Sequence, residues 1–227
     1  RVRGLRGGHS GIDIHRNRMN AIHALVRLLL QGAGEQALRL ASIDGGNKRN
    51  AIPREAGATL CIADAGAFHR GVDAAAAALR AQFRGLEDRL EVRVQPAAPP
   101  PDAWSEADSQ RLLDLLRSVP SGVVALSSDI PGLVETSSNL GVVRTRGDSA
   151  EILMLARSSV APALAGLIDT HRSLARLAGA RLAYLGGYPG WQPDLGSHVL
   201  GVTRRAYARV FGHEPQVTAV HAGLECG

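Results

Sequence analysis

The stretch Gly132–Arg157, GLVETSSNLGVVRTRGDSAEILMLAR, decides the fold that the sequence predicts. Its arms, Gly132–Thr145 and Ala150–Arg157, are rich in the aliphatic and β-branched residues that strands favour. Residues 146–149 between the arms, Arg-Gly-Asp-Ser, have the composition of a tight turn. Two such arms joined by a short turn predict an antiparallel β-hairpin.

A helix is predicted directly after this hairpin. Ser159 is placed to cap it, Pro162 falls in its first turn, and Gly179 ends it. Because His171 lies on the apolar face of this helix, we interpret it as a core histidine rather than a ligand. The other members of that face, at helical spacing, are Leu164, Leu167, Ile168, Leu174 and Leu177.

The part of the chain before the hairpin alternates between predicted strands and helices. The Pro96–Pro101 segment is expected to be a stiff extended linker. Strands are expected over residues 1–7, 38–43, 56–63 and 92–94, and helices over 16–31, over 68–90 and from Ser105 to Pro120. This order predicts a two-layer α/β sandwich over residues 1–179, with helices on one face of an antiparallel sheet.

Residues 180–227 are predicted to form a second unit, an incomplete piece of an α/β domain. We expect a strand at 181–185, a helix over 197–211 closed by Gly212, and a strand at 216–220 that leads into a loop at His221. The chain opens without a methionine and stops after a turn-like motif, so it is expected to be a fragment of a longer protein.

Composition narrows the class of protein. Of the 227 residues, 45% are hydrophobic, which supports a substantial core, and few are aromatic, so that core must be aliphatic. No run reaches the ~18 apolar residues of a membrane helix. The two cysteines, Cys61 and Cys226, form no disulfide framework, and Cys61 lies in an apolar run and is expected to be buried. A reducing, cytoplasmic location is therefore predicted.

The positive net charge does not indicate a nucleic-acid partner. The net charge is +5, and Lys48 is the only lysine among 26 basic residues, with the arginines scattered along the chain. No basic block alternates with aromatic residues as in a nucleic-acid-binding surface. We therefore expect neither a nucleic-acid nor a membrane partner.

One histidine stands in a turn that could present it to a ligand. The segment Arg6–Gly11, RGGHSG, surrounds His9 with glycines, which bend the backbone tightly and let the imidazole stand clear of the chain. Such a histidine can donate a hydrogen bond or exchange a proton near neutral pH. The alternative interpretation is an ordinary strand-to-helix turn.

Two further side chains suit the binding of a carboxylate. Asn50 follows a Gly-Gly turn and precedes Ala-Ile-Pro, where it can offer both a donor and an acceptor. Arg157 ends an apolar strand, and a guanidinium fixed there suits a carboxylate clamp. An asparagine in a turn and an ordinary arginine at a strand end remain the alternatives.

Two loops near the end of the chain supply the remaining candidates. Tyr188 and Trp191 lie in the rigid segment Gly-Tyr-Pro-Gly-Trp, which can wall a pocket or cover a core edge. His221 and Glu225 flank Ala-Gly-Leu and are candidate substrate contacts. A lone pair of this kind is weak evidence for a metal.

A complete hydrolytic centre cannot be assembled from these residues. The sequence has no H-x-D motif, no adjacent Glu-Glu, no histidine pair at i, i+4 and no G-x-S-x-G motif.

Several motifs nevertheless recur together in one known group of proteins. They are Gly7–Gly11 with Asp13-Ile14-His15, Arg49–Ala56, Val134–Val143, Arg157-Ser158, Leu177–Ala180, Tyr188–Pro193 and His221–Gly227. Together they resemble the bacterial aminoacyl-histidine dipeptidases, also called peptidase D or Xaa-His dipeptidases, within the di-zinc aminoacylase/carboxypeptidase superfamily. The resemblance covers essentially the whole chain. It implies a lid domain over residues 1–179 and the C-terminal part of a truncated zinc-peptidase catalytic domain over 180–227.

The resemblance implies a role for each candidate residue. His9 resembles the lid histidine that stabilises the oxyanion of the tetrahedral intermediate. Asn50 and Arg157 resemble the lid residues that bind the C-terminal carboxylate of the substrate. The other residues expected to contact the substrate are Tyr188, Trp191, His221 and Glu225.

The resemblance also implies a cofactor, a substrate and a partner. The full-length enzyme is expected to hold two zinc ions with ligands outside this chain, to hydrolyse Xaa-His and other carnosine-like dipeptides, and to form a homodimer. No metal ligand is expected within the chain, and the fragment alone is expected to be inactive. The alternative is a non-catalytic binding or dimerisation module that retains the lid.

Overall fold

The structure, a computed structural model, describes residues 1–223 of the chain. Its strands are β1 (Val2–Arg3), β2 (Gly8–His9), β3 (Leu38–Gly45), β4 (Ala51–Ile52), β5 (Ala56–Ile62), β6 (Glu91–Val92), β7 (Gly122–Leu126), β8 (Val134–Arg146) and β9 (Ser149–Ser158). Its helices are α1 (Ala21–Ala33), α2 (Ala65–Gln82), α3 (Glu106–Ser118), α4 (Ala161–Leu177) and α5 (His198–Phe211), with a 3-10 turn at Ile14–Arg16.

The hairpin predicted from residues 132–157 is present and forms one side of the main sheet, with β9 as its edge strand. Strand β8 pairs with β9 along its length, so that its other edge is left for β7 at one end and β3 at the other. The sheet has seven strands in the order β6-β1-β5-β3-β8-β7, with β9 beside β8. Every pairing within residues 1–223 is antiparallel.

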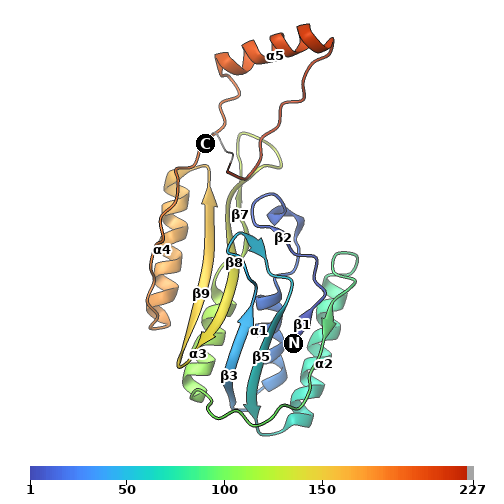
Figure 1. Ribbon diagram of the computed structural model, residues 1–227, viewed down its shortest axis with the longest axis vertical. Helices are drawn as coiled ribbons and strands as arrows, with labels where there is room; N and C mark the ends of the chain where they lie inside the picture. Colours follow the sequence, from blue (N-terminus) through green and yellow to red (C-terminus); the bar gives the residue numbers. More distant parts are fainter. Residues whose placement is uncertain (224–227) are drawn as a thin grey trace.

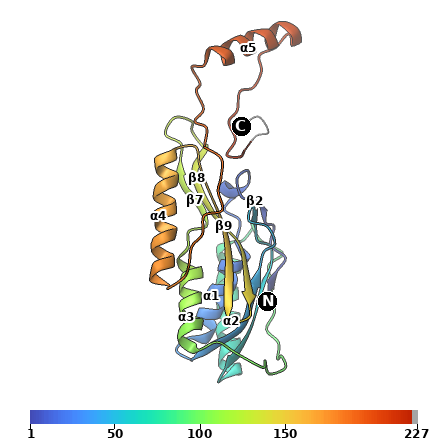
Figure 2. The same ribbon diagram turned by 60° about the vertical axis from the view of Figure 1, so that its left-hand side comes forward.

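Helices α1 to α4 cover one side of this sheet (Figures 1 and 2). The core between the two layers is aliphatic, as the composition predicts, and its fully buried members include Ile22, Leu28, Leu40, Ile43, Leu113 and Leu140. A short two-stranded ribbon of β2 and β4 lies against the middle of β8, between the stretches of β8 that pair with β7 and with β3. The predicted two-layer arrangement, with helices on an antiparallel sheet, is confirmed.

Two helix–hairpin–helix units make up this sandwich. The first contains α1, the β3–β5 pair and α2, and the second contains α3, the β8–β9 pair and α4. The units join edge to edge where Asp44 and Gly45 of β3 pair with Arg144 and Val143 of β8. The seven-stranded sheet is therefore continuous across both units.

Helix caps explain several boundaries. Asn20 caps α1 by accepting hydrogen bonds from the Ile22 and His23 amides, and Ser105 caps α3 by accepting one from Asp108, as predicted. The predicted cap at Ser159 is wrong, because α4 begins after Val160, which makes no side-chain cap bond in the described chain. Ser158 instead accepts the Val160 amide through its hydroxyl.

Other sequence-based boundaries also need correction. Helix α2 ends at Gln82 rather than near residue 90, because Gly85 adopts a φ of +79° and its amide bonds to the Asp88 carboxylate. Strand β7 was not expected, since its side chains are half-exposed and lack a clear alternation. Cys61 is half-buried rather than buried, and Cys226 lies outside the described residues.

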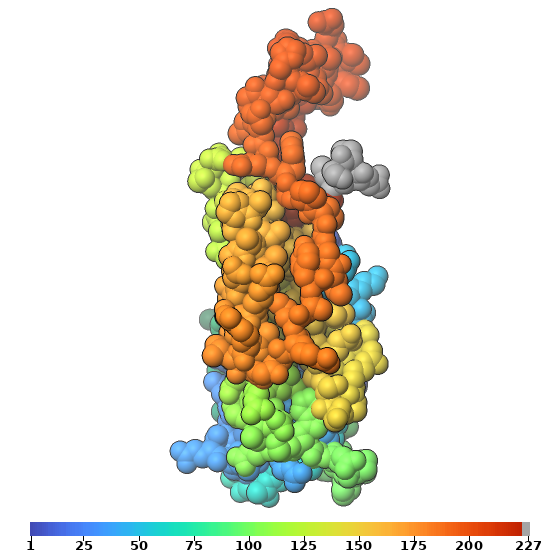
Figure 3. Space-filling model, turned by 90° about the vertical axis from the view of Figure 1, so that its left-hand side faces the viewer, coloured from blue at the N-terminus to red at the C-terminus, as the bar shows by residue number. Residues whose placement is uncertain are grey.

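The strands expected at 181–185 and 216–220 are absent, whereas the helix that Gly212 closes is present as α5. From residue 180 the chain runs back beside α4 and then leaves the sandwich, and α5 stands beyond the end of the sheet with no buried residue (Figures 1 and 3). A strand needs a hydrogen-bonded neighbour, and the described residues place none beside these two segments. No helix in residues 1–223 has both the length and the apolar character needed to cross a membrane.

Candidate functional site

The β2–β4 ribbon brings two sequence-predicted residues to one place. His9 pairs with Ala51, and Gly8 pairs with Ile52. The Ser10 amide donates a 2.9 Å hydrogen bond to the Asn50 carbonyl, which extends this pairing by one step. The Asn50 side chain is exposed. Turns that lie about 40 residues apart in the sequence therefore lie side by side at one end of the sheet.

The His9 turn fixes the proton on the imidazole ring. Nδ1 of His9 accepts hydrogen bonds from the amides of Gly11, at 3.2 Å, and Ile12, at 3.1 Å. A neutral ring whose Nδ1 accepts must carry its proton on Nε2. Burial first, and the Arg157 charge second, lower the pKa of His9, while Asp13 opposes the shift. At neutral pH His9 is therefore a neutral donor through Nε2.

Asp13 anchors the backbone of this turn. Its carboxylate accepts the His9 amide at 2.9 Å and lies 3.2 Å from guanidinium nitrogens of Arg16 and Arg18. The hydrogen bond from the His9 amide is the largest cause of the lowered pKa of Asp13, and the charges of Arg18 and Arg16 lower it further. Desolvation of the carboxylate opposes this shift. Gly7, at a φ of +57°, begins the turn in a conformation that side chains disfavour.

Arg157 presents an unpaired buried donor beside this turn. It lies on β9 opposite Ser137 of β8. Its Nε atom is buried and has no hydrogen-bond partner within residues 1–223. Ser137, its partner on β8, hydrogen bonds to His221, and the Arg157 charge contributes to the lowered pKa of both His9 and His221. A guanidinium beside two neutral imidazoles is a site for an anion.

His221 joins the same group from the far end of the chain. Its Nε2 lies 2.7 Å from the Ser137 hydroxyl. Burial and the Arg157 charge lower the pKa of His221 to about 4, with a hydrogen bond to the Val134 backbone in opposition. A Cβ added at Gly11 would collide with the His221 carbonyl, so the loop contacts the His9 turn directly.

The aromatic loop reaches this region through its backbone. A Cβ at Gly190 would collide with the Ser158 carbonyl, next to Arg157, and one at Gly223 would collide with the Tyr188 hydroxyl. Tyr188 thus lies against the loop that carries His221, whereas Trp191 is 73% exposed. Glu225 lies outside the described residues.

Three supporting residues were not identified from the sequence. Asp13 holds the His9 turn, Ser137 holds His221, and Asn139 hydrogen bonds to the backbone around Asn50. For Ser137 and Asn139, the signal in the sequence is the polar run Thr136–Asn139 inside a predicted strand. Polar side chains are uncommon at buried strand positions, and each of these four residues is 1% exposed or less.

The described residues do not fit a metal centre. No group of three or more histidine, cysteine, aspartate or glutamate side chains in residues 1–223 is arranged to hold a metal ion. The histidines of this site are instead engaged with backbone amides and with Ser137.

Comparisons with known proteins agree with this architecture. Residues 1–84 match the peptidase dimerisation domain family. The chain is 38% identical over 228 aligned positions to a cytosol non-specific dipeptidase of Escherichia coli K12, covering all of this chain and 47% of that protein. It superposes on the crystal structure of an aminoacylhistidine dipeptidase from Vibrio alginolyticus with a TM-score of 0.93 and 36% identity, covering all of this chain and 46% of the other.

The chain thus spans about half the length of each of these relatives. Identity of this size along the whole chain, together with the close superposition, shows common descent rather than a shared fold alone. Residues 1–84 are similar to the peptidase dimerisation domain family, and the chain as a whole is homologous to about one half of a bacterial dipeptidase.

Proposed function

We propose that this chain is the lid-bearing part of a metal-dependent dipeptidase that cleaves Xaa-His and other dipeptides, including carnosine-like ones. The observation that carries the proposal is the buried Arg157 Nε without a partner in residues 1–223, next to the neutral rings of His9 and His221. Such a group suits the free C-terminal carboxylate that every dipeptide carries.

His9 supplies the hydrogen bond that strengthens as the peptide bond is attacked. Its Nε2–H is available because Nδ1 is occupied by the Gly11 and Ile12 amides. A neutral donor held by backbone amides needs no reorganisation as negative charge develops on the carbonyl oxygen. His9 is therefore an oxyanion donor, and its lowered pKa keeps the imidazole ring neutral at neutral pH.

Arg157 and Asn50 orient the substrate by binding its C-terminal carboxylate, while His9 acts at the peptide bond. The guanidinium pairs with the carboxylate, and the exposed Asn50 amide, on the neighbouring turn, donates to the same group. Tyr188, Trp191, His221 and Glu225 complete the substrate contacts in this proposal. Two zinc ions, bound by residues outside this chain, would polarise the scissile carbonyl and activate the attacking water.

The proposal extends to assembly and location. The match to a dimerisation domain supports a homodimer, and a relative named as a cytosol dipeptidase supports a cytoplasmic enzyme. The alternative, a non-catalytic module that keeps the carboxylate site, shares the same lid, so the lid alone does not separate the two functions.

The test compares dipeptides with their C-terminal amides, using the full-length protein with and without a chelator. We expect carnosine and related dipeptides to be hydrolysed, the amides to be cleaved far more slowly, and the chelator to abolish both activities. Equal hydrolysis of acids and amides would contradict the carboxylate site. Binding of dipeptides without hydrolysis would instead support the non-catalytic module.

A further inference from the structure

Asn139 connects strand β8 to the turn that carries Asn50. Its side-chain amide donates 2.9 Å hydrogen bonds to the carbonyls of both Arg49 and Ala51, the two neighbours of Asn50. Asn139 is 1% exposed, and its partners lie 90 and 88 residues earlier in the chain. Both donors of one buried amide are thus used to fix the backbone on either side of one proposed substrate-binding residue.

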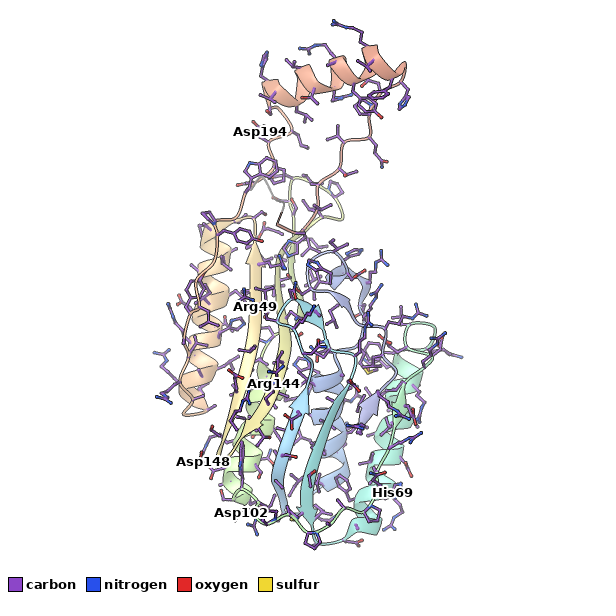
Figure 4. All side chains as sticks on the ribbon, viewed as in Figure 1. Arg49, His69, Asp102, Arg144, Asp148 and Asp194 are labelled. Atoms are coloured by element: carbon purple, nitrogen blue, oxygen red, sulfur yellow. The ribbon has the colours of Figure 1, made fainter. Side chains whose placement is uncertain are left out.

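The turn fits closely onto β8 at this point. A Cβ added at Gly141 would lie 2.6 Å from the Cα atom of Arg49, and one at Gly46 would collide with the Gly141 carbonyl. Figure 4 shows Arg49 over the strands of the sheet, far from Asp148 in the β8–β9 turn. The contact leaves no room for a side chain between turn and strand, so Asn139 acts on a backbone already in van der Waals contact.

The same hydrogen bonds also reach the His9 turn. The Asn50 carbonyl accepts the Ser10 amide at 2.9 Å, and Ala51 pairs with His9. Fixing residues 49–51 therefore fixes the strand partner of His9. Ser138, the preceding residue of β8, faces the other way and contacts His171 of α4 at 3.2 Å.

The position of Asn139 carries an energetic cost, because only part of its side-chain amide is hydrogen-bonded. Its Oδ1 atom is buried and has no partner within residues 1–223. An unpaired buried amide oxygen is unfavourable, and a leucine of similar shape would avoid that penalty. A role in fixing the turn, rather than in filling the core, accounts for an amide at this position.

We propose that Asn139 is a positioning residue that sets the place of Asn50 and, through the β2–β4 ribbon, of His9. The consequence for substrate binding rests on the proposed function, because it requires Asn50 to contact the carboxylate. The positioning itself does not, since it concerns only hydrogen bonds within this chain.

The test uses the full-length protein with Asn139→Leu, and with Asn139→Ser as a smaller second variant. Hydrogen exchange is measured at residues 9–12 and 48–52, with residues 149–157 of β9 as the internal reference. We expect exchange in the two turns to become roughly tenfold faster or more, and that of β9 to stay unchanged. The matched control is Ser138→Ala, which also loses a buried hydrogen bond but should leave both turns unchanged.

Kinetics provide the second readout. We expect Asn139→Leu to raise KM for free-acid dipeptides roughly tenfold, with a smaller change in kcat, and to leave KM for dipeptide amides unchanged. Faster exchange in the turns with an unchanged KM would support the positioning and would instead remove Asn50 from carboxylate binding. Unchanged exchange in both variants, an equal increase throughout the domain, or failure of both variants to fold would overturn the proposal.

Discussion

At the scale of single residues, the site depends on the protonation states of two histidines, His9 and His221. His9 is neutral because its Nδ1 accepts two backbone amides and because burial and Arg157 oppose a positive charge on the ring. His221 is neutral for similar reasons, through burial and the same guanidinium. Arg157 is thus a cation whose charge acts on two uncharged imidazole rings.

Removal of His9 should affect the chemical step. In the full-length protein we expect His9→Ala to lower kcat by about two to three orders of magnitude with little change in KM, because an oxyanion donor acts mainly in the transition state. The control is His15→Ala, an exposed histidine six residues further along. Steady-state hydrolysis of a dipeptide checks this, and a kcat equal to that of the control would remove His9 from the mechanism.

Removal of Arg157 should affect binding. We expect Arg157→Met to raise KM for free-acid dipeptides by about ten- to a hundredfold, since a charge-assisted pair with the carboxylate is lost. The KM for the corresponding amides should not change. Arg144→Met, lower on the same sheet in Figure 4, is the matched control. Equal increases for acids and amides would argue against a carboxylate clamp.

The lowered pKa of His221 predicts how stability varies with pH. In the unfolded chain this histidine binds a proton near its ordinary pKa of 6.5, whereas in the folded chain its pKa is about 4. The unfolded state therefore holds more protons between these values, and stability falls as pH decreases from about 6.5 to 4. Melting temperatures of the wild type and His221→Gln across this range should converge at low pH. Parallel curves would contradict a neutral buried His221.

At the scale of elements, β8 organises the site because its polar residues serve different neighbours. Thr136 contacts Ser158 at 2.8 Å, while Ser137 and Asn139 hold the loops of the site on one face. The hairpin and most helices could be predicted from local periodicity and caps, and on α4 Leu167 and His171 are buried as predicted. Leu177, which the spacing assigns to the same apolar face, is instead 84% exposed, because it is the last residue of the helix. The convergence of the site could not, because it arises from pairings across 40 to 100 residues that leave no local signal.

Glu87, in the loop after α2, holds the two ends of the segment that carries the His9 turn. This carboxylate is 3% exposed and accepts the amides of Arg6, at 2.8 Å, and Met19, at 3.1 Å, on either side of the His9 turn. We expect Glu87→Ala to lower the free energy of unfolding by about 2–4 kcal/mol, since two buried amides lose a charged acceptor. Glu87→Gln should cost less.

Urea denaturation of the full-length protein measures this difference. Asp102→Ala, at the exposed opposite end of the molecule in Figure 4, serves as the control and should be neutral. A loss for Glu87→Ala no larger than that of the control would show that the two amides are satisfied in another way.

At the scale of the whole molecule, residues 1–179 carry the core and residues 180–223 add contacts at only a few points. Helix α5 has no buried residue, and large apolar side chains there, including Val199, Val210 and Phe211, are exposed. The strands expected at 181–185 and 216–220 require neighbours that the described residues do not provide. Their patterns are those of segments that pair with another part of a protein.

This arrangement predicts where a protease cuts. Limited trypsin digestion of the chain as given should cleave first at Arg181 and at the arginines of α5, and leave a resistant product of about residues 1–179. Mass spectrometry identifies the product. Cleavage within β3, β8 or β9 at the same rate would contradict the division of the chain at residue 179.

The β2–β4 ribbon and strand β8 together fix the separation between Arg157 and His9, because hydrogen bonds connect the two. Backbone pairing joins Arg157 to β8 and His9 to β4, and the Asn139 side chain joins β8 to the turn before β4. In the proposed enzyme this separation allows only one residue between the bound carboxylate and the peptide bond that is cleaved. A peptide anchored by its terminal carboxylate at Arg157 can bring only its last amide bond to His9. Selection for chain length would then reside in the rigid sandwich, and a change of preferred side chain would leave it intact.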